Sequence, residues 1–224
     1  MASLKLVDVT KVFGEGTNEV VALNRVNFES RQGELTLILG PSGSGKSTLL
    51  TIIGGLQSPT SGEVYVNGQL VDVKDVKSSD FFRLNQVGFV LQSHSLVPFL
   101  TVKKQFELAD RVKKQNNLQT EQFNHYLQIL GIDQLLDKYP NQLSVGQSQR
   151  VAIARAIYTN PDFILADEPT AALDSDRVKK VGELFKQIAT AEDKAVVIVT
   201  HDLRLEQFAD HVYHIEDGAI TQTK

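Results

Sequence analysis

The chain has 224 residues, of which 42% are hydrophobic and 22% are charged, which is ordinary for a globular protein of one large domain or of one domain with an insertion. Its longest apolar runs are far too short to span a membrane, and a net charge of −4 argues against a nucleic-acid-binding surface. Without a single cysteine, it has neither a disulfide framework nor a thiolate metal site.

The first patterned segments are predicted to be β-strands. Residues 4–9 and 20–28 contain regularly placed apolar residues and flank a polar turn that contains glycine. Further along, residues 63–71 predict a hairpin, because the Asn67-Gly68 pair suits a type I′ turn. These strands are too amphipathic for the core of a parallel sheet, so we expect them to form a separate antiparallel sheet.

Between these strands lies a glycine-rich stretch that matches the pattern G-x-x-x-x-G-K-[ST]. It consists of Gly40, Pro41, Ser42, Gly43, Ser44, Gly45, Lys46, Ser47 and Thr48. The apolar run 35–39 before it predicts a buried strand, and residues 48–53 after it read as the start of a helix. A strand, a glycine-rich turn and a helix in this order are the context that identifies a P-loop.

The chemistry of phosphate binding explains these residue types. Glycines let successive backbone N–H groups curl around a phosphate, and the helix N-terminus adds its partial positive charge. Lys46 is expected to reach the β- and γ-phosphates, and the Ser47 hydroxyl to ligate Mg²⁺. A turn that merely connects a strand to a helix would need neither the lysine nor these flanking elements. The sequence therefore predicts a nucleotide-binding protein.

The middle of the chain changes character. Apolar residues recur there at helical spacing, namely Val102, Phe106, Ala109 and Val112, and later Phe123, Leu127 and Leu130. Residues 147–158 predict another helix, which stops before Pro161. We therefore expect a single domain over residues 1–224, with a helical subdomain at approximately 93–160 inserted into its core.

The last third of the chain returns to alternating strands and helices. Residues 163–166 and 195–199 predict buried strands, 178–188 predict a helix, and a final hairpin turns at Asp217-Gly218. This alternation predicts a mostly parallel sheet, which binds ligands at the carboxyl ends of its strands. Three chemically useful residues follow such ends, namely Lys46, Glu168 and His201.

Several short motifs occur in a fixed order after the P-loop. They are Gln92 after a small apolar strand, Leu143-Ser144-Val145-Gly146-Gln147 at a helix start, Asp167-Glu168-Pro169-Thr170, Ala172-Leu173-Asp174, and His201. With these motifs, essentially the whole chain resembles the nucleotide-binding subunits of ATP-binding cassette (ABC) transporters. The resemblance implies an α/β fold with a P-loop NTPase core and a mostly parallel sheet, an N-terminal antiparallel β-subdomain and an inserted α-helical subdomain. It also implies transport-coupled ATP hydrolysis, with ATP and Mg²⁺ as cofactors.

The resemblance assigns roles within one subunit. Phe13 is expected to stack on adenine, and Asp167 to hold Mg²⁺ together with Ser47 and Gln92. Gln92 would also sense the membrane partner. Glu168 is expected to be the general base for the attacking water, and His201 to position that water and the γ-phosphate.

Other roles belong to a dimer of two copies of the chain. Ser144, Gly146 and Gln147 are expected to bind the nucleotide held by the opposite subunit, and Asp174 to connect the two sites. The stretch Leu143-Ser144-Val145-Gly146-Gln147 corresponds to the signature motif of the family. The commonest form of this motif has glycine where this chain has Val145, and Ser148 replaces a more usual Gln, Lys or Glu. If the position of Val145 required a positive φ, valine would be strained there and ATP hydrolysis could be slowed.

The resemblance also implies partners and a location. We expect an integral-membrane permease and a second copy of the chain as partners, and no nucleic acid. Since Met1-Ala2-Ser3-Leu4-Lys5 lacks the apolar core of a signal peptide, we expect a cytoplasmic protein that is peripheral on the inner face of the membrane through the permease.

The type of transporter is narrowed by further stretches. Residues 53–56, 59–64 and 14–16 look like the macrolide-export and lipoprotein-release group, and 92–100 and 200–210 are similar to its haem-export branch. The sequence therefore predicts haem efflux. Alternatives are efflux of a macrolide or an antimicrobial peptide, lipoprotein release, and a soluble ABC ATPase of DNA repair or translation, although such proteins usually carry tandem cassettes or long insertions. A module that binds ATP without hydrolysing it is disfavoured by Glu168 and His201.

Overall fold

The computed structural model describes residues 3–71 and 76–224, so Met1 and Ala2 of the N-terminal segment discussed above lie outside the described residues. The strands are β1 (Ser3–Phe13), β2 (Val20–Arg31), β3 (Leu35–Leu39), β4 (Ser61–Val66), β5 (Gln69–Leu70), β6 (Val87–Val90), β7 (Phe163–Asp167), β8 (Ala195–Thr200), β9 (His211–Glu216) and β10 (Ala219–Gln222). The helices are α1 (Lys46–Ile53), α2 (Val76–Gln86), α3 (Val102–Val112), α4 (Thr120–Ile129), α5 (Val145–Tyr158) and α6 (Ser175–Ala191). Short 3-10 turns lie at η1 (Gly16–Asn18), η2 (Asp133–Leu135), η3 (Pro140–Gln142) and η4 (Leu203–Phe208).

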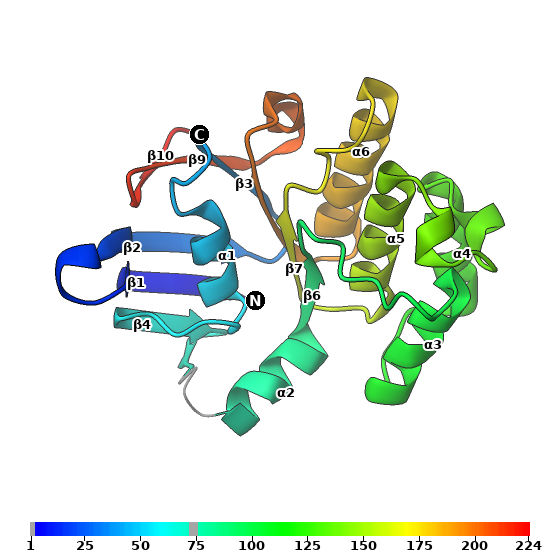
Figure 1. Ribbon diagram of the computed structural model, residues 1–224, viewed down its shortest axis with the longest axis horizontal. Coiled ribbons are helices and arrows are strands. Elements are labelled where there is room, and N and C mark those ends of the chain that lie inside the picture. The colour runs from blue at the N-terminus through cyan, green and yellow to red at the C-terminus, as the bar shows by residue number, and fades with distance from the viewer. Residues whose placement is uncertain (1–2, 72–75) are drawn as a thin grey trace.

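The early strands form a four-stranded antiparallel sheet in the order β2-β1-β4-β5, which confirms the prediction from their amphipathic patterns. This sheet lies at one end of the molecule (Figure 1). Asn67 and Gly68 join β4 to β5 with φ angles of 53° and 74°. Positive φ at both central positions is the requirement of a type I′ turn, and asparagine and glycine tolerate it best.

A second, six-stranded sheet has the order β10-β9-β3-β8-β7-β6. Only β9 and β10 pair antiparallel, so the sheet is mostly parallel, as predicted. Its register aligns Leu39 with Thr200, and Asp167 with Val199. The segments that follow β3, β7 and β8 therefore leave the sheet at the same edge, and these segments contain the P-loop, Glu168 and His201.

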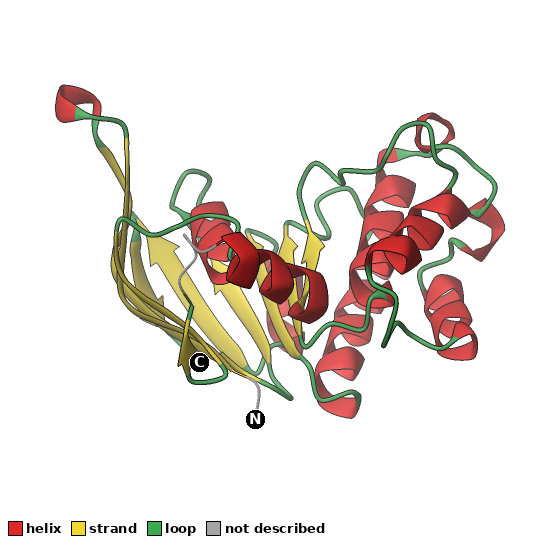
Figure 2. Cartoon of the chain, turned by 90° about the horizontal axis from the view of Figure 1, so that it is seen from below, coloured by secondary structure: helices red, strands yellow, loops and turns green. Residues whose placement is uncertain are grey.

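The residues of the central strands alternate between two apolar cores, because successive side chains of a strand point to opposite faces. Leu37 and Ile198 belong to a core shared with α5 and α6. Ile38 and Val197 belong to a second core, shared with α1 and the antiparallel sheet. Figure 2 shows the strands stacked between these two layers. Both faces are covered, which explains why these strands read as continuous apolar runs.

The helices α3, α4 and α5 lie between β6 and β7 in sequence and form a group at the other end of the molecule (Figure 1). We propose that residues 93–160 are one helical subdomain within a single domain. Helix α5 begins at Val145 rather than at the predicted Gln147, because Ser144 caps it: the Ser144 Oγ accepts a hydrogen bond from the Gln147 N–H at 3.2 Å, and the Gln147 Oε1 accepts one from the Ser144 N–H at 2.8 Å.

Helix α2 was not among the predicted elements. Its apolar residues do not form a single stripe, since Phe82 is buried whereas Phe81 and Leu84 are exposed. Among the residues that the structure describes, no helix has both the length and the apolar character that crossing a bilayer requires.

Candidate active site

A cleft of about 520 Å³ lies at the carboxyl edge of the six-stranded sheet. It is lined by Ala22, Ser42, Gly43, Gly45, Lys46, Ser47, Thr48, Gln92, Asp167, Glu168, Ala171 and His201. The structure therefore brings together most of the P-loop with Gln92, Asp167, Glu168 and His201. These residues come from four separate parts of the sequence, and the parallel register of the sheet unites them.

The P-loop has the backbone that its glycines predict. Gly45 has a φ of 104°, and a Cβ added there would lie 2.3 Å from the carbonyl oxygen of Ala22. Only glycine fits this position, for both reasons. Helix α1 begins at the next residue, Lys46, so its unpaired N–H groups face the cleft edge where a phosphate could bind.

Lys46 is buried, and its ammonium group is turned onto its own loop. The Nζ donates hydrogen bonds of 2.7 Å to the carbonyl oxygens of Gly40 and Pro41. Carbonyl oxygens are weaker acceptors than phosphate oxygens, so a bound phosphate could take over these bonds. Nearby, the buried hydroxyl of Ser44 has no hydrogen-bond partner among the residues that the structure describes.

Asp167 ends β7 and is buried. Its pKa is raised, chiefly because burial removes the carboxylate from water, and the neighbouring Glu168 adds to this effect, while Ser47 and Lys46 oppose it. A cation beside Asp167 would relieve this cost. The hydroxyl of Ser47, the carboxylate of Asp167 and the amide oxygen of Gln92 are all oxygen ligands, which suit a hard cation such as Mg²⁺. The residues present therefore fit the predicted metal.

Glu168 follows Asp167 in an unusual backbone conformation, with a φ of 49°. Its N–H donates a 2.9 Å hydrogen bond to the Val199 carbonyl, which ties this residue to the end of β8. Its side chain is buried, and both carboxylate oxygens have partners. Thr200 Oγ1 donates to Oε2 at 2.6 Å, and His201 Nδ1 lies 2.8 Å from Oε1. Because a carboxylate only accepts, Nδ1 carries the proton in this pair.

Other predicted site residues do not line this cleft, namely Phe13, Gly40, Pro41, Ser44, Ser144, Gly146, Gln147 and Asp174. Gly40, Pro41 and Ser44 belong to the P-loop itself. Ser144 and Asp174 are the N-caps of α5 and α6, and both are exposed. Gly146 packs against the segment before α6, since a Cβ on it would lie 2.8 Å from the Ala172 carbonyl. The signature motif and Asp174 thus form a second group, on the helix starts.

Two of the predicted residues have specific surroundings. Val145 is the first residue of α5 and does not have a positive φ, so valine is not strained at this position. Phe13 ends β1 and is 40% exposed, with the Lys11 ammonium 5.2 Å from the centre of its ring. An exposed aromatic face beside a cation is compatible with stacking on a flat ligand.

Sequence reasoning missed several residues at this site. Ala22 and Ala171 line the cleft, and small apolar residues carry no motif that could reveal them. Thr200 directly follows the predicted strand 195–199 and was assigned no role, although its hydroxyl contacts Glu168. Its place directly before His201 is the only signal that the sequence offers.

Comparison with known proteins agrees with this geometry. A model of the ABC transporter family matches residues 23–171. HrtA of Staphylococcus aureus (strain MRSA252), named as a hemin import ATP-binding protein, is 46% identical over 223 residues, which cover 98% of this chain and 99% of HrtA. HrtA of strain Newman gives the same identity and coverage.

Solved structures are similar as well. A dimeric structure of MJ0796, a bacterial ABC transporter cassette, matches with a TM-score of 0.91 and 39% identity, covering 99% of this chain and 98% of that one. A post-hydrolysis dimer of MJ0796 bound to ADP and Pi matches with a TM-score of 0.87 and 40% identity at the same coverage. The P-loop cleft, the fold and these relatives lead to one conclusion: the chain belongs to the ABC transporter family, as an ATP-binding subunit that hydrolyses ATP.

Proposed function

We propose that this chain powers the export of hemin by hydrolysing ATP in the cleft at the P-loop, as the partner of a membrane permease. The observation that carries the catalytic part is the carboxylate of Glu168, which lines the cleft together with Lys46 and His201. Phosphoryl transfer needs positioned reactants and neutralised charge more than it needs covalent catalysis. This cleft supplies a cation, a base and N–H donors in one place.

The proposed reaction converts ATP and water to ADP and phosphate. Glu168 accepts a proton from the attacking water as the water oxygen bonds to the γ-phosphorus, and the bond from that phosphorus to the oxygen of ADP breaks. Lys46 neutralises charge on the β- and γ-phosphates. His201 positions the water and the γ-phosphate. Phe13 stacks on adenine, and backbone N–H groups of residues 40–48 hold the phosphates.

We further propose that Ser47, Gln92 and Asp167 hold Mg²⁺ in this cleft. When bound, the cation would supply charge neutralisation for the phosphate oxygens. The raised pKa of Asp167 supports this role, because a buried carboxylate benefits from a positive neighbour. Gln92 lies at the boundary between the sheet and the helical segment, and so could also report the state of the permease.

A second copy of the chain is proposed to complete the site. Ser144, Gly146 and Gln147 lie at the N-terminus of α5 and do not line the cleft of their own subunit. A helix N-terminus binds anions well, so these residues could receive the γ-phosphate of a nucleotide held by the opposite subunit. Asp174 would connect the two sites. The dimeric structure of MJ0796 supports such a pair.

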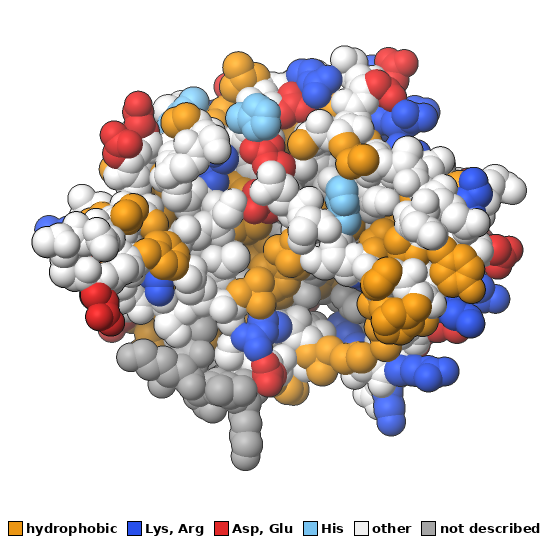
Figure 3. Space-filling view, in the orientation of Figure 1, with side chains coloured by type: hydrophobic (Ala, Val, Ile, Leu, Met, Phe, Trp, Pro, Cys, Tyr) orange, Lys and Arg blue, Asp and Glu red, His pale blue; other side chains and the backbone are white. Residues whose placement is uncertain are grey.

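The permease is proposed to dock on a groove between α2 and α3. The groove has a volume of about 310 Å³ and is lined by apolar residues, including Leu84, Leu108 and Val112, and by the cations Arg83, Lys113 and Arg155. Among the described residues that line it, none is acidic. Figure 3 shows hydrophobic side chains gathered around the hollow between these helices. An amphipathic segment with an acidic residue would complement this surface. Such docking would hold the subunit on the inner face of the cell membrane.

Hemin is proposed as the cargo because HrtA, a relative along nearly the whole chain, is named for hemin transport. That name specifies import, whereas the similarity of residues 92–100 and 200–210 to the haem-export branch favours export. Hemin partitions into bilayers and is toxic in excess, so a permease could collect it from the membrane while this subunit supplies ATP-driven closure.

The experiment compares cells that carry the native chain with cells that carry Glu168→Gln, and measures growth and intracellular hemin after hemin is added. Export predicts more intracellular hemin and poorer growth in the variant. Import predicts less hemin in the variant. Normal growth in hemin combined with sensitivity to a macrolide or an antimicrobial peptide would instead identify another efflux cargo. A chain that co-purifies with no permease would point to a soluble ABC ATPase.

A further inference from the structure

The side chain of Glu168 is held from two directions, and the two contacts differ in character. Thr200 Oγ1 donates to Oε2 at 2.6 Å from the end of β8, and Thr200 is fully buried. His201 Nδ1 contacts Oε1 at 2.8 Å, but the His201 side chain is 71% exposed. The hydrogen bond from Thr200 is therefore fixed by the sheet, whereas the exposed His201 side chain can move away from Glu168.

The direction of the Thr200 hydrogen bond is fixed by a second contact. Thr200 Oγ1 accepts a 3.0 Å hydrogen bond from the backbone N–H of Asp202. Since the hydroxyl has a single proton, and an N–H can only donate, that proton goes to the carboxylate of Glu168. A hydrogen bond to a charged acceptor is among the stronger ones in proteins.

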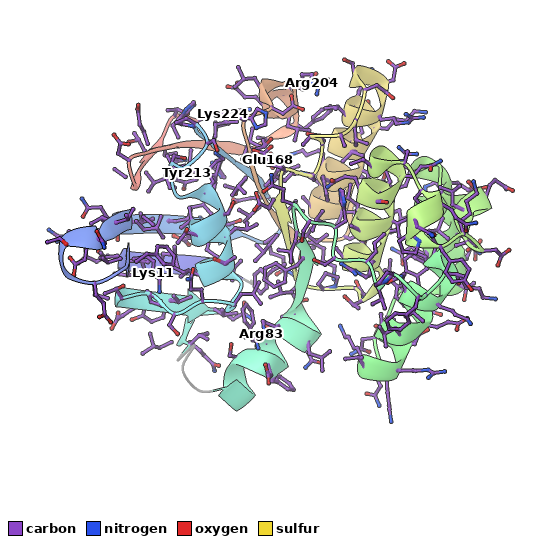
Figure 4. The ribbon with its side chains drawn as sticks, in the orientation of Figure 1. Lys11, Arg83, Glu168, Arg204, Tyr213 and Lys224 are labelled. Carbon is purple, nitrogen blue, oxygen red and sulfur yellow. The ribbon has the colours of Figure 1, made fainter. Side chains whose placement is uncertain are left out.

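Asp202 is in turn held in place by its neighbours. The guanidinium of Arg204 donates two hydrogen bonds of 2.8 Å to the Asp202 carboxylate, from Nε to Oδ1 and from Nη2 to Oδ2. Thr170 Oγ1 donates to Oδ2 at 2.9 Å, which ties Asp202 to the segment that follows Glu168. Arg204 Nη1 also donates to Ser175 Oγ at 3.1 Å, at the start of α6. Figure 4 shows Glu168 near the centre of the molecule and Arg204 above it.

We propose that Thr200 is a positioning residue for the catalytic base, and that Asp202 and Arg204 hold Thr200 in place. The hydrogen bond from Thr200 engages Oε2 of Glu168, so Oε1 of Glu168 is the oxygen that takes the proton of the attacking water. His201 must leave Oε1 before this step, and it is free to move towards the γ-phosphate because its side chain is exposed. This inference rests on the proposed role of Glu168 as base.

The backbone of Glu168 explains why such a support is needed. A φ of 49° is unfavourable for a glutamate and persists only where the surroundings enforce it. The hydrogen bond from the Glu168 N–H to the Val199 carbonyl fixes the main chain, but it leaves the side-chain torsions of Glu168 free. The Thr200 hydroxyl restricts those torsions, and small misplacements of a catalytic group cost large factors in rate.

The test compares Thr200→Val, which has nearly the same shape but no hydroxyl, with Thr200→Ser, which keeps the hydroxyl. In the full chain with Mg²⁺ and ATP, we expect kcat of the valine variant to fall at least about tenfold, as the loss of a charged hydrogen bond implies. Its KM for ATP should stay within about twofold, because Thr200 does not line the nucleotide cleft. The serine variant should recover most of kcat, with a rate within about threefold of the parent.

The outcomes separate this inference from the proposed function. If Glu168→Gln abolishes hydrolysis while Thr200→Val keeps the parent kcat, Glu168 is the base and Thr200 does not position it. If Glu168→Gln hydrolyses ATP at the parent rate, the role of Glu168 itself is wrong. Should Thr200→Val fail to fold, Thr200→Ala replaces it, since alanine and serine differ by the hydroxyl alone; equal kcat values for these two would overturn the proposal.

Discussion

The Nζ of Lys46 lies 2.7 Å from the carbonyl oxygen of Gly40, so the lysine ammonium finds a hydrogen-bond acceptor within the P-loop itself. Both residues also belong to the segment expected to bind the β- and γ-phosphates. The hydrogen bonds to Gly40 and Pro41 hold the buried ammonium in place at the cleft. A bound phosphate would take over these hydrogen bonds, and the charge-assisted bonds that replace them are stronger than the bonds to the carbonyl oxygens.

Lys46→Ala removes this charge and is expected to lower ATP affinity or turnover at least about tenfold, since a charge-assisted hydrogen bond contributes about 1.5–3 kcal/mol. Titration with a fluorescent ATP analogue and a phosphate-release assay measure the two quantities. Lys104→Ala, an exposed lysine on α3, is the matched control and should behave like the parent. Unchanged binding and unchanged hydrolysis in Lys46→Ala would refute the P-loop assignment.

Glu168→Gln keeps the shape of the side chain but cannot take a proton from water. ATP should therefore remain bound, and the variant should elute from size-exclusion chromatography as a dimer only when ATP and Mg²⁺ are present. Adding Ser144→Arg places a bulky side chain at the exposed N-terminus of α5 and should abolish the dimer. Loss of the cap costs only about 1 kcal/mol, so this double variant should still fold. A dimer that persists in it would argue against the signature contact.

Much of the fold was predictable because its strands carry strong patterns. The strands β3, β7 and β8 are short, apolar and buried on both faces, and such runs are easily recognised. The Asn67-Gly68 turn was equally clear, because few residue pairs tolerate positive φ twice. Helix α2 was missed, since its apolar residues are divided between buried and exposed positions.

The candidate site was predictable in its residues but not in its contacts. Motif order gave Lys46, Asp167, Glu168 and His201, and each of these lines the cleft. The bond between Thr200 and Glu168 depends on the register of β7 against β8, in which Asp167 aligns with Val199. Nothing in the two strand sequences fixes that register, because every residue of both strands is buried and no alternation of polar and apolar residues distinguishes one face from the other.

The link between β3 and β9 gives a prediction about stability and pH. Asp210 Oδ2 accepts a 2.8 Å hydrogen bond from the Leu35 N–H, and Oδ1 is paired with Lys186. Burial alone would raise the pKa of Asp210, but Lys186 and the Leu35 N–H outweigh it, so the pKa is lowered below the ordinary 3.8. A carboxylate with a lowered folded pKa stabilises the protein above its unfolded pKa, and this contribution is lost as the pH falls through the folded pKa.

Asp210→Asn is therefore expected to lower the free energy of unfolding by about 1 kcal/mol at pH 7. The difference from the parent should stay constant down to about pH 4 and shrink at more acidic pH, as Asp210 of the parent becomes protonated. Urea titrations at several pH values measure this, with the exposed Asp137→Asn as control. A difference that grows as the pH falls would contradict the sign of the pKa shift.

The groove between α2 and α3 leads to the last prediction. Val112 lines this groove and is 57% exposed, so Val112→Asp should fold normally, because surface substitutions change stability by roughly 0.5 kcal/mol or less. Burying the new carboxylate against a permease would be costly, and it would also repel an acidic segment. We expect the variant to lose co-purification with the permease.

The matched control for the groove is Leu70→Asp, which places the same charge on a similarly exposed apolar residue of β5, 59% exposed. This variant should retain co-purification with the permease. In Val112→Asp, ATP hydrolysis by the isolated subunit should stay within about twofold of the parent, because Val112 does not line the nucleotide cleft. Equal loss of the permease in both variants would show that the groove is not the specific docking surface, since any added charge would then have the same effect.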